Sequence, residues 1–150
     1  MRLLAELLAF SLIILATEAC RCLPLSANEA FKNAEWVSRV KILGKKKELN
    51  SERESTVYKV KHIEVFKNTR SPQKLPAMIS TPTSSAACGL FLKTGKQYLL
   101  SGGFTDQGNL TAIMCGQIAL NDENSQSFGI VLQWNEVPED LKEKLRKGTL

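Results

Sequence analysis

Apolar and polar residues alternate along most of the middle of the chain. Five segments combine this alternation with β-branched and aromatic side chains, and polar or glycine-bearing turns separate them. Such a pattern predicts short β-strands. The expected strands cover residues 36–44, 55–66, 75–81, 96–104 and 110–120. Strands of this length and spacing are typical of a small antiparallel barrel, so a mainly β fold is predicted.

The second of these segments changes phase partway along. Tyr58 and Val60 fall on one face of the strand, whereas Ile63 and Val65 fall on the other. Because side chains alternate strictly along a strand, a bulge or sharp coil would be needed to return both pairs to the core. We therefore predict an irregularity in this strand.

Helix is predicted only at the two ends of the domain. Ser26 and Glu29 have the spacing of a capping box, which opens a short helix. The sequence Pro-Glu-Asp at 138–140 begins a second helix, with Leu141 and Leu145 on one face and basic residues in its last turn.

The first residues of the chain resemble a secretory leader. An apolar run precedes Thr17 and Ala19, which place small residues at the third and first positions before Cys20. Signal peptidase recognises this pattern. The run is shorter than the ~20 residues that a membrane span needs, and Glu6 interrupts it. We expect residues 1–19 to be a removed signal peptide and the protein to be secreted.

Removal of this leader leaves residues 20–150, a length that suits one domain with a modest core. The leader holds one of the 20 basic and two of the 15 acidic residues, so this domain carries a net charge of +6. Such a charge favours acidic partners such as matrix polysaccharide, although it is also typical of a solubilising surface. The lysines at 45–47 are predicted to form a solvated loop tip. We expect a monomer with no nucleic-acid or membrane partner.

All four cysteines follow the predicted cleavage site, and an even number in an oxidising compartment indicates disulfides. The gaps of 65 and 26 residues do not match zinc-site spacings, and His62 is the only histidine. A bridge from Cys20 to Cys22 would close a ring that disulfide geometry disfavours. The sequence leaves both other connectivities open, and each joins the N-terminal pair to Cys88 and Cys115.

The residues do not indicate an enzyme. The cysteines are expected to be bridged, and the single histidine has no evident catalytic partner. His62 is interpreted as a core or barrel-wall residue, and Trp36 and Trp134 as packing residues. Asn109 begins a glycosylation sequon on or beside a predicted hairpin turn at 105–109.

Several short stretches occur together in a familiar order and spacing between residues 20 and 120. They are Cys20-Arg21-Cys22-Leu23-Pro24, Ala30-Phe31, Tyr58-Lys59-Val60-Lys61 with Phe66-Lys67, Cys88-Gly89 with Phe91, Tyr98-Leu99-Leu100-Ser101-Gly102, and Leu110-Thr111 before Cys115. This set resembles the N-terminal domain of the tissue inhibitors of metalloproteinases. The resemblance implies a netrin-like domain, which is a five-stranded barrel of the oligonucleotide/oligosaccharide-binding type with flanking helices. It also implies bridges from Cys20 to Cys88 and from Cys22 to Cys115.

The resemblance further implies a function. In that family the α-amino group and carbonyl oxygen of the first cysteine chelate the catalytic zinc of a secreted metalloproteinase, and the inhibitor needs no cofactor of its own. Arg21 would then point into the specificity pocket of the protease. The residues implied to form the inhibitory wedge are Cys20, Arg21, Cys22, Leu23, Pro24, Ala86, Ala87, Cys88 and Gly89.

The chain departs from the family pattern in three ways. Lys32 stands where a further cysteine is expected, and the cysteine-rich second domain of those inhibitors is not expected here. Arg21 replaces a small hydroxyl residue. The alternative function is therefore a netrin-like module that binds matrix or signalling partners and inhibits nothing.

We predict that the secreted chain begins at Cys20, because Thr17 and Ala19 form the cleavage pattern. N-terminal sequencing and intact mass measurement of secreted protein would test this. A first residue other than Cys20 would remove the chelation mechanism, since a preceding residue blocks the amine.

Overall fold

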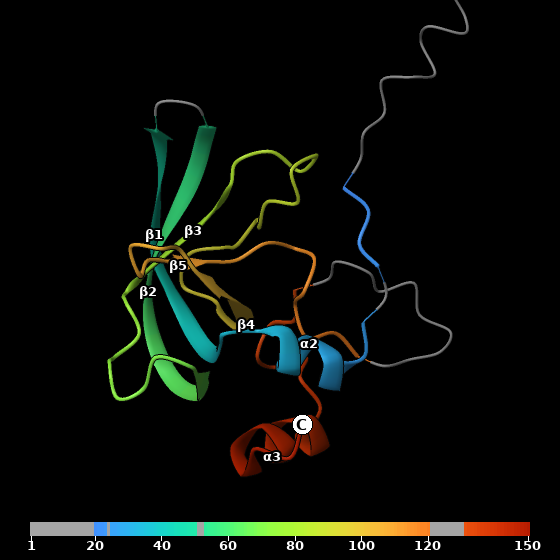
Figure 1. Cartoon of the computed structure of the whole chain (residues 1–150). Coiled ribbons are helices and arrows are strands. Elements are labelled where there is room, and N and C mark those ends of the chain that lie inside the picture. Colours follow the sequence, from blue (N-terminus) through green and yellow to red (C-terminus); the bar gives the residue numbers. More distant parts are fainter. Residues whose placement is uncertain (1–19, 24, 51–52, 121–130) are drawn as a thin grey trace, which may run out of the picture.

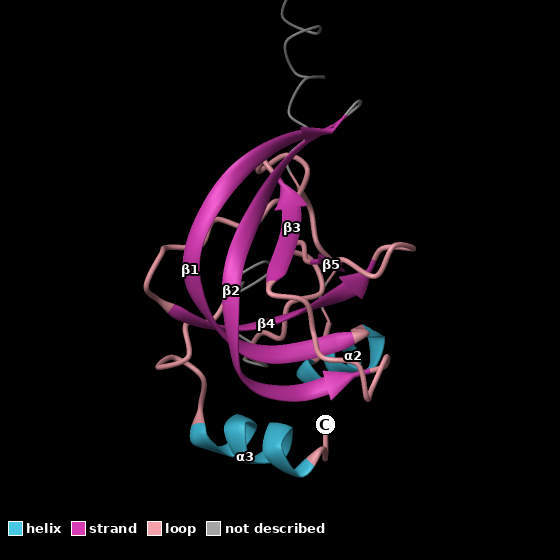
Figure 2. Cartoon of the chain, turned by 90° about the vertical axis from the view of Figure 1, so that its left-hand side faces the viewer, coloured by secondary structure: helices cyan, strands magenta, loops and turns pink. Residues whose placement is uncertain are grey.

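Five strands form a closed barrel, and two short helices pack against its outside (Figure 1, Figure 2). The structure is a computed structural model that describes residues 20–23, 25–50, 53–120 and 131–150. None of the helices in this part of the chain is long and apolar enough to cross a membrane. The elements are α2 (Ala27–Asn33), β1 (Trp36–Asn50), β2 (Arg53–Asn68), β3 (Met78–Pro82), β4 (Gln97–Phe104), β5 (Leu110–Thr111) and α3 (Glu139–Lys147).

The strands follow one another around the barrel in the order β1, β2, β3, β5, β4. All neighbours are antiparallel except β3 and β5, which pair in parallel through Ile79 with Leu110 and Ser80 with Thr111. A ring with an odd number of strands cannot alternate direction all the way round, so one parallel pair is required. The predicted five-stranded barrel is confirmed, with this one exception to its antiparallel pairing.

The first strand is longer than predicted. β1 continues to Asn50 and pairs with β2 as a long hairpin, so the lysines at 45–47 lie within a strand and not at a loop tip. Opposite charges help to keep this extension in place. Lys47 Nζ lies 3.2 Å from Glu54 Oε1 across the hairpin, and Lys46 forms an ion pair with Glu48.

The predicted irregularity in β2 is present. The pairing with β1 passes over Ile63 and Phe66, which are extra residues on the β2 side. Ile63 and Val65 nevertheless remain 39% and 50% exposed, so the expectation that they return to the core is wrong. The inner positions of this region are taken by other residues, including Trp36, which is fully buried.

His62 lies next to the first bulge and forms part of the barrel wall, as predicted. Its Nδ1 is 2.9 Å from Ser38 Oγ, and its Nε2 is 3.0 Å from the carbonyl oxygen of Pro76. Burial lowers the pKa of His62, and the hydrogen bond to Pro76 opposes that shift. The imidazole is therefore a structural bridge between β1, β2 and the following loop.

The prediction of a strand over 110–120 is wrong, because β5 contains only two residues. The chain turns at Gly116, whose φ is +97°. The side chain of Gln117 then forms two hydrogen bonds with β4. Its Nε2 donates to Ser101 O at 2.8 Å, and its Oε1 accepts from Ser101 N at 3.1 Å. A side-chain amide thus satisfies backbone groups that a longer strand would otherwise pair.

Within the described residues, two hydrophobic cores stabilise the fold. One fills the barrel and includes Trp36, Tyr58, Ile79, Leu100 and Leu110. The other lies between the barrel and the two helices, where it includes Phe31, Leu99, Ile118, Trp134, Leu141 and Leu145. Both tryptophans are buried, which confirms their predicted packing role.

Both helices begin where the sequence predicts. Ser26 and Glu29 form the capping box of α2, with Ser26 Oγ accepting from Glu29 N at 3.2 Å. In α3, Leu141 and Leu145 are buried on one face, and Gly148 closes the helix with a φ of +63°.

A polar cluster on β1 and β2 holds α3 against the barrel. Glu64 Oε2 accepts from Arg39 Nη1 at 3.1 Å, and Glu64 Oε1 accepts from Arg146 Nε at 3.2 Å. Both guanidinium groups lie over the Trp134 ring, at 4.6 and 5.9 Å from its centroid. Burial by itself would raise the pKa of Glu64, but the hydrogen bonds and charges of Arg146 and Arg39 outweigh it and lower the pKa.

We predict that Glu64→Gln lowers the free energy of unfolding at pH 7 by about 0.5 to 1 kcal/mol, the range for partly exposed ion pairs. The pKa of Glu64 in the folded state lies below its usual value of 4.5. The stabilisation from its two ion pairs is therefore present above pH 4.5 and is lost as the pH falls through the lowered pKa. Urea unfolding at pH 7 and pH 3 would measure both effects. Glu143→Gln, which breaks an exposed pair within α3, should change stability less. Equal effects of the two variants would contradict the prediction.

Candidate functional site

Residues 20–23 lie on the outside of the barrel and are joined to it by two disulfides. Cys20 is bonded to Cys88 and Cys22 to Cys115, with Cα–Cα distances of 5.2 and 5.1 Å. This is the pairing that the family resemblance implies, out of the two that the sequence left open. In Figure 1 the blue segment at 20–23 lies to the right of the barrel, beside the two segments to which the disulfides join it.

The two bridges pack directly against each other. Cys115 Sγ lies 3.5 Å from Cys88 Sγ and 3.6 Å from Cys20 Sγ. All four sulfurs lie within 4.8 Å of one another, which is close enough for one metal ion. Because all four are bonded as disulfides, they offer no thiolate to ligate a metal.

The side chains of this segment alternate between the barrel and solvent. Cys20 and Cys22 are half-buried, whereas Arg21 is exposed and Leu23 is 85% exposed. Pro24 lies outside the described residues. Among the residues that the structure describes, no acidic group forms an ion pair with Arg21. The bridges therefore fix the backbone and leave the side chains of Arg21 and Leu23 free to meet a partner.

A tight turn carries the second half of the site. Cys88 N donates to Ser85 O at 3.0 Å, and Ala86 N donates to Ser84 Oγ at 3.1 Å. Cys88 has a φ of +59°, a left-handed conformation that costs a non-glycine residue roughly 1 kcal/mol. Ala86 and Ala87 are exposed at the tip of this turn.

Gly89 attaches the turn to β3. A Cβ at this position would lie 2.0 Å from Pro82 O and 3.0 Å from Ser84 O, so only glycine fits. The Tyr58 hydroxyl, inside the barrel, then donates to Leu90 O at 2.9 Å and accepts from Leu92 N at 3.0 Å. The core of the barrel thus positions the turn that carries Ala86 and Ala87.

We call the surface formed by residues 20–23 and 86–89 the N-terminal ridge. The structure brings every described residue of the predicted site into it, although its two parts are more than sixty residues apart in the sequence. A groove of about 700 Å³ adjoins the ridge at Ala87, and Ser80, Thr83 and Ser84 give it a hydroxyl-rich lining. The sequence did not predict this groove, because three separate segments form it.

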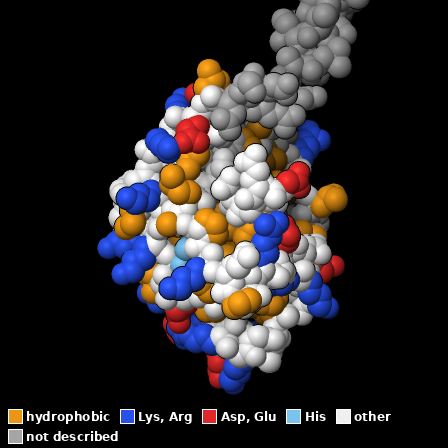
Figure 3. Space-filling model, turned by 60° about the vertical axis from the view of Figure 1, so that its left-hand side comes forward, with side chains coloured by type: hydrophobic (Ala, Val, Ile, Leu, Met, Phe, Trp, Pro, Cys, Tyr) orange, Lys and Arg blue, Asp and Glu red, His pale blue; other side chains and the backbone are white. Residues whose placement is uncertain are grey.

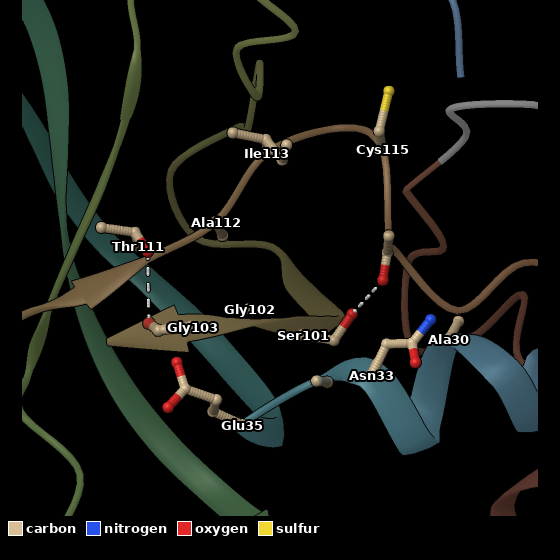
Figure 4. Close-up of a pocket in the computed structure, with 12 residues that line it drawn as sticks. Ala30, Asn33, Glu35, Ser101, Gly102, Gly103, Thr111, Ala112, Ile113 and Cys115 are labelled. Atoms are coloured by element: carbon tan, nitrogen blue, oxygen red, sulfur yellow. Dashed lines mark hydrogen bonds between the residues drawn. The ribbon is translucent and has the colours of Figure 1, made fainter. Parts of the chain in front are cut away.

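A smaller cavity of about 310 Å³ lies between α2 and the β4–β5 pair, near Cys115 (Figure 4). Two of its polar side chains are already hydrogen-bonded to the backbone. Glu35 Oε2 accepts from Phe104 N at 2.8 Å, and Ser101 Oγ donates to Gly116 O at 2.9 Å. A Cβ on Gly102 would lie 1.9 Å from Thr111 O, which shows how closely β4 and β5 approach here. This cavity is a feature of packing.

A closed five-stranded barrel with short flanking helices is the fold of the netrin-like domains. Residues 18–133 match the family model for tissue inhibitor of metalloproteinase. The chain belongs to that family.

Named relatives agree with this assignment. A Caenorhabditis elegans protein, tag-225, whose name places it among the metalloproteinase inhibitors, is 38% identical over 94% of both chains. Metalloproteinase inhibitor 2 from Homo sapiens and from Bos taurus is 34% identical in each case, over 72% of this chain. The match spans 54% of the length of these two mammalian proteins.

Proposed function

We propose that this chain is a secreted inhibitor of zinc metalloproteinases and that the N-terminal ridge is its inhibitory surface. The observation that supports this most strongly is the pair of packed disulfides, which fixes the segment at residues 20–23 with Arg21 and Leu23 exposed. Family membership supports metalloproteinase inhibition in general. The mechanism proposed here also requires cleavage before Cys20.

The proposed zinc ligands are the free α-amino nitrogen and the carbonyl oxygen of Cys20. They would displace the zinc-bound water that attacks the substrate. An α-amine has a pKa near 7.7 to 8.0, so its deprotonation for metal binding costs little at neutral pH. The sulfur takes no part as a ligand, because it is bonded to Cys88.

Rigidity is the second contribution of the ridge. A peptide loses backbone and side-chain entropy when a binding site orders it, and a segment already held in place loses less. Two bridges and the Gly89 contact with β3 hold the ridge before it meets a partner. The exposed Arg21 and Leu23 would then enter the protease cleft on either side of Cys22, together with Ala86 and Ala87.

A netrin-like binding module without inhibitory activity is the second candidate function. The excess of basic side chains favours it, because that charge suits an acidic matrix polysaccharide or signalling partner. The two candidates differ in whether the Cys20 amine matters. An inhibition panel of secreted zinc proteases with correctly processed protein separates them.

We predict that one alanine added before Cys20 abolishes inhibition, since the zinc-binding amine would become an amide. The disulfides and thermal unfolding temperature should not change. Inhibition constants against the most sensitive protease of the panel would measure the effect. One alanine added after Leu150 is the matched control and should inhibit as the natural chain does. If both extended chains inhibit equally, the amine is not a ligand.

We predict that Arg21→Thr tightens binding to proteases with an apolar specificity pocket and weakens binding to those with a carboxylate there. An unpaired guanidinium in an apolar pocket costs several kcal/mol, and about 1.4 kcal/mol is a factor of ten. The change for an apolar pocket is therefore expected to reach about a hundredfold. Inhibition constants for one protease of each type would measure it. No change with either protease would show that Arg21 stays outside the pocket.

A further inference from the structure

The turn between β4 and β5 is closed by its own backbone. Thr105 N donates to the carbonyl oxygen of Asn109 at 2.9 Å, and Gly108 N donates to that of Thr105 at 2.8 Å. Asn109 N also donates to Thr105 Oγ1 at 3.1 Å. The turn therefore forms without any contribution from the side chain of Asn109.

The fold does not explain why residue 109 is an asparagine. Asparagine is favoured in turns because its side chain bonds nearby backbone groups and because it tolerates the left-handed conformation. Asn68 shows the first reason, since its Oδ1 accepts from Arg70 N at 3.0 Å and its Nδ2 donates to Gln73 O at 2.7 Å. Within the part of the chain that the structure describes, the Asn109 side chain has no hydrogen-bond partner, and its φ is not positive.

The sequence around this turn supplies a reason of another kind. Asn109-Leu110-Thr111 is the one Asn-x-Ser/Thr sequon of the chain, and its asparagine is exposed. This tripeptide is the acceptor sequence for N-linked glycans in secreted proteins. We propose that Asn109 carries an N-linked oligosaccharide, and this inference rests on the proposed secretion of the chain.

The modification is a group transfer from a lipid pyrophosphate-linked oligosaccharide. Asn109 Nδ2 forms a bond to the anomeric carbon of the first sugar while the bond from that carbon to the pyrophosphate oxygen breaks. Nδ2 loses one proton, and the lipid pyrophosphate leaves with the bonding electron pair. The step therefore needs no oxidant or reductant.

The transfer has to precede the folding of β5. The transferase recognises the hydroxyl at the third position of the sequon, which is why the motif requires Ser or Thr there. In the folded protein Thr111 Oγ1 donates to Gly103 O at 3.3 Å, and Leu110 is fully buried in the barrel core. The complete sequon is therefore accessible only in the unfolded chain during export. The exposed position of Asn109 lets the glycan remain once the barrel has closed.

The glycan would lie at the end of β5 that is remote from the N-terminal ridge. In Figure 4 the chain runs from Thr111 on the left, where it pairs with Gly103, to Cys115 on the right. Cys115 is bonded to Cys22 of the ridge, whereas the turn enters β5 from the other end. Figure 1 likewise shows β5 to the left of residues 20–23. A glycan on this turn therefore leaves the ridge free to bind a protease.

The turn is also a part of the surface with little charge. Asp106 is the one charged residue at 105–109. Elsewhere charge keeps the surface hydrophilic, and Figure 3 shows basic side chains following one another down the left side of the molecule. Beside the turn, Arg70 donates to Thr105 O and lies 4.5 Å from the centroid of the Phe104 ring. A glycan would add hydrophilic cover to this apolar ring.

The test is expression in eukaryotic cells, with the natural leader and in parallel with the leader of an established secreted protein. Intact mass is measured before and after treatment with a peptide N-glycosidase. The natural chain should lose the mass of one oligosaccharide, and peptide mapping should place the resulting aspartate at residue 109. Asn109→Gln and Thr111→Val should be secreted without the glycan. Thr111→Ser is the matched control, which keeps the hydroxyl and should keep the glycan.

Secreted natural chain that loses no mass would overturn the proposal, as would a glycan that Asn109→Gln retains. Inhibition constants of the glycosylated chain and of Asn109→Gln should agree within about twofold, because separate sites couple weakly. A larger difference would overturn the separation of the glycan from the ridge. If only the borrowed leader gives secreted, glycosylated protein, the proposed natural secretion fails and the acceptor site stands. If the glycosylated chain and the variant inhibit no protease, only the proposed inhibitory function fails.

Discussion

The contact between two disulfide bridges is the constraint on which the N-terminal ridge depends. The bridges close loops with sequence separations of 68 and 93 residues, and in the chain-entropy model each stabilises the fold by roughly 4 kcal/mol. Their sulfurs touch, so the segment that begins at Cys20 is attached at one place to two distant parts of the barrel. A hydrogen bond of 2.8 Å from Met114 N to Cys88 O joins those two parts directly. The segment at residues 20–23 thereby becomes part of a rigid surface.

The barrel supplies the rest of that rigidity from inside. Tyr58 is buried in the barrel core, yet its hydroxyl fixes Leu90 and Leu92 and so the turn that precedes them. On the opposite flank, α3 is held by a hydrophobic core and by the Glu64 cluster over Trp134. The ridge is thus supported by barrel packing, while α3 completes a second core that the barrel alone would leave exposed.

The sequence by itself determined the strand-rich barrel, the capping box at Ser26 and the start of α3, because local periodicity and caps decide these features. The family resemblance added the ridge residues. Only the tertiary structure decided the rest. Spacing could not choose between two cysteine pairings, since that choice depends on which loops meet in space. The run at 110–120 stops pairing after Thr111 because Gln117, a side chain from further along, satisfies β4. The pairing of Lys41 with Lys61 across β1 and β2 depends on strand register, which bulges shift residue by residue.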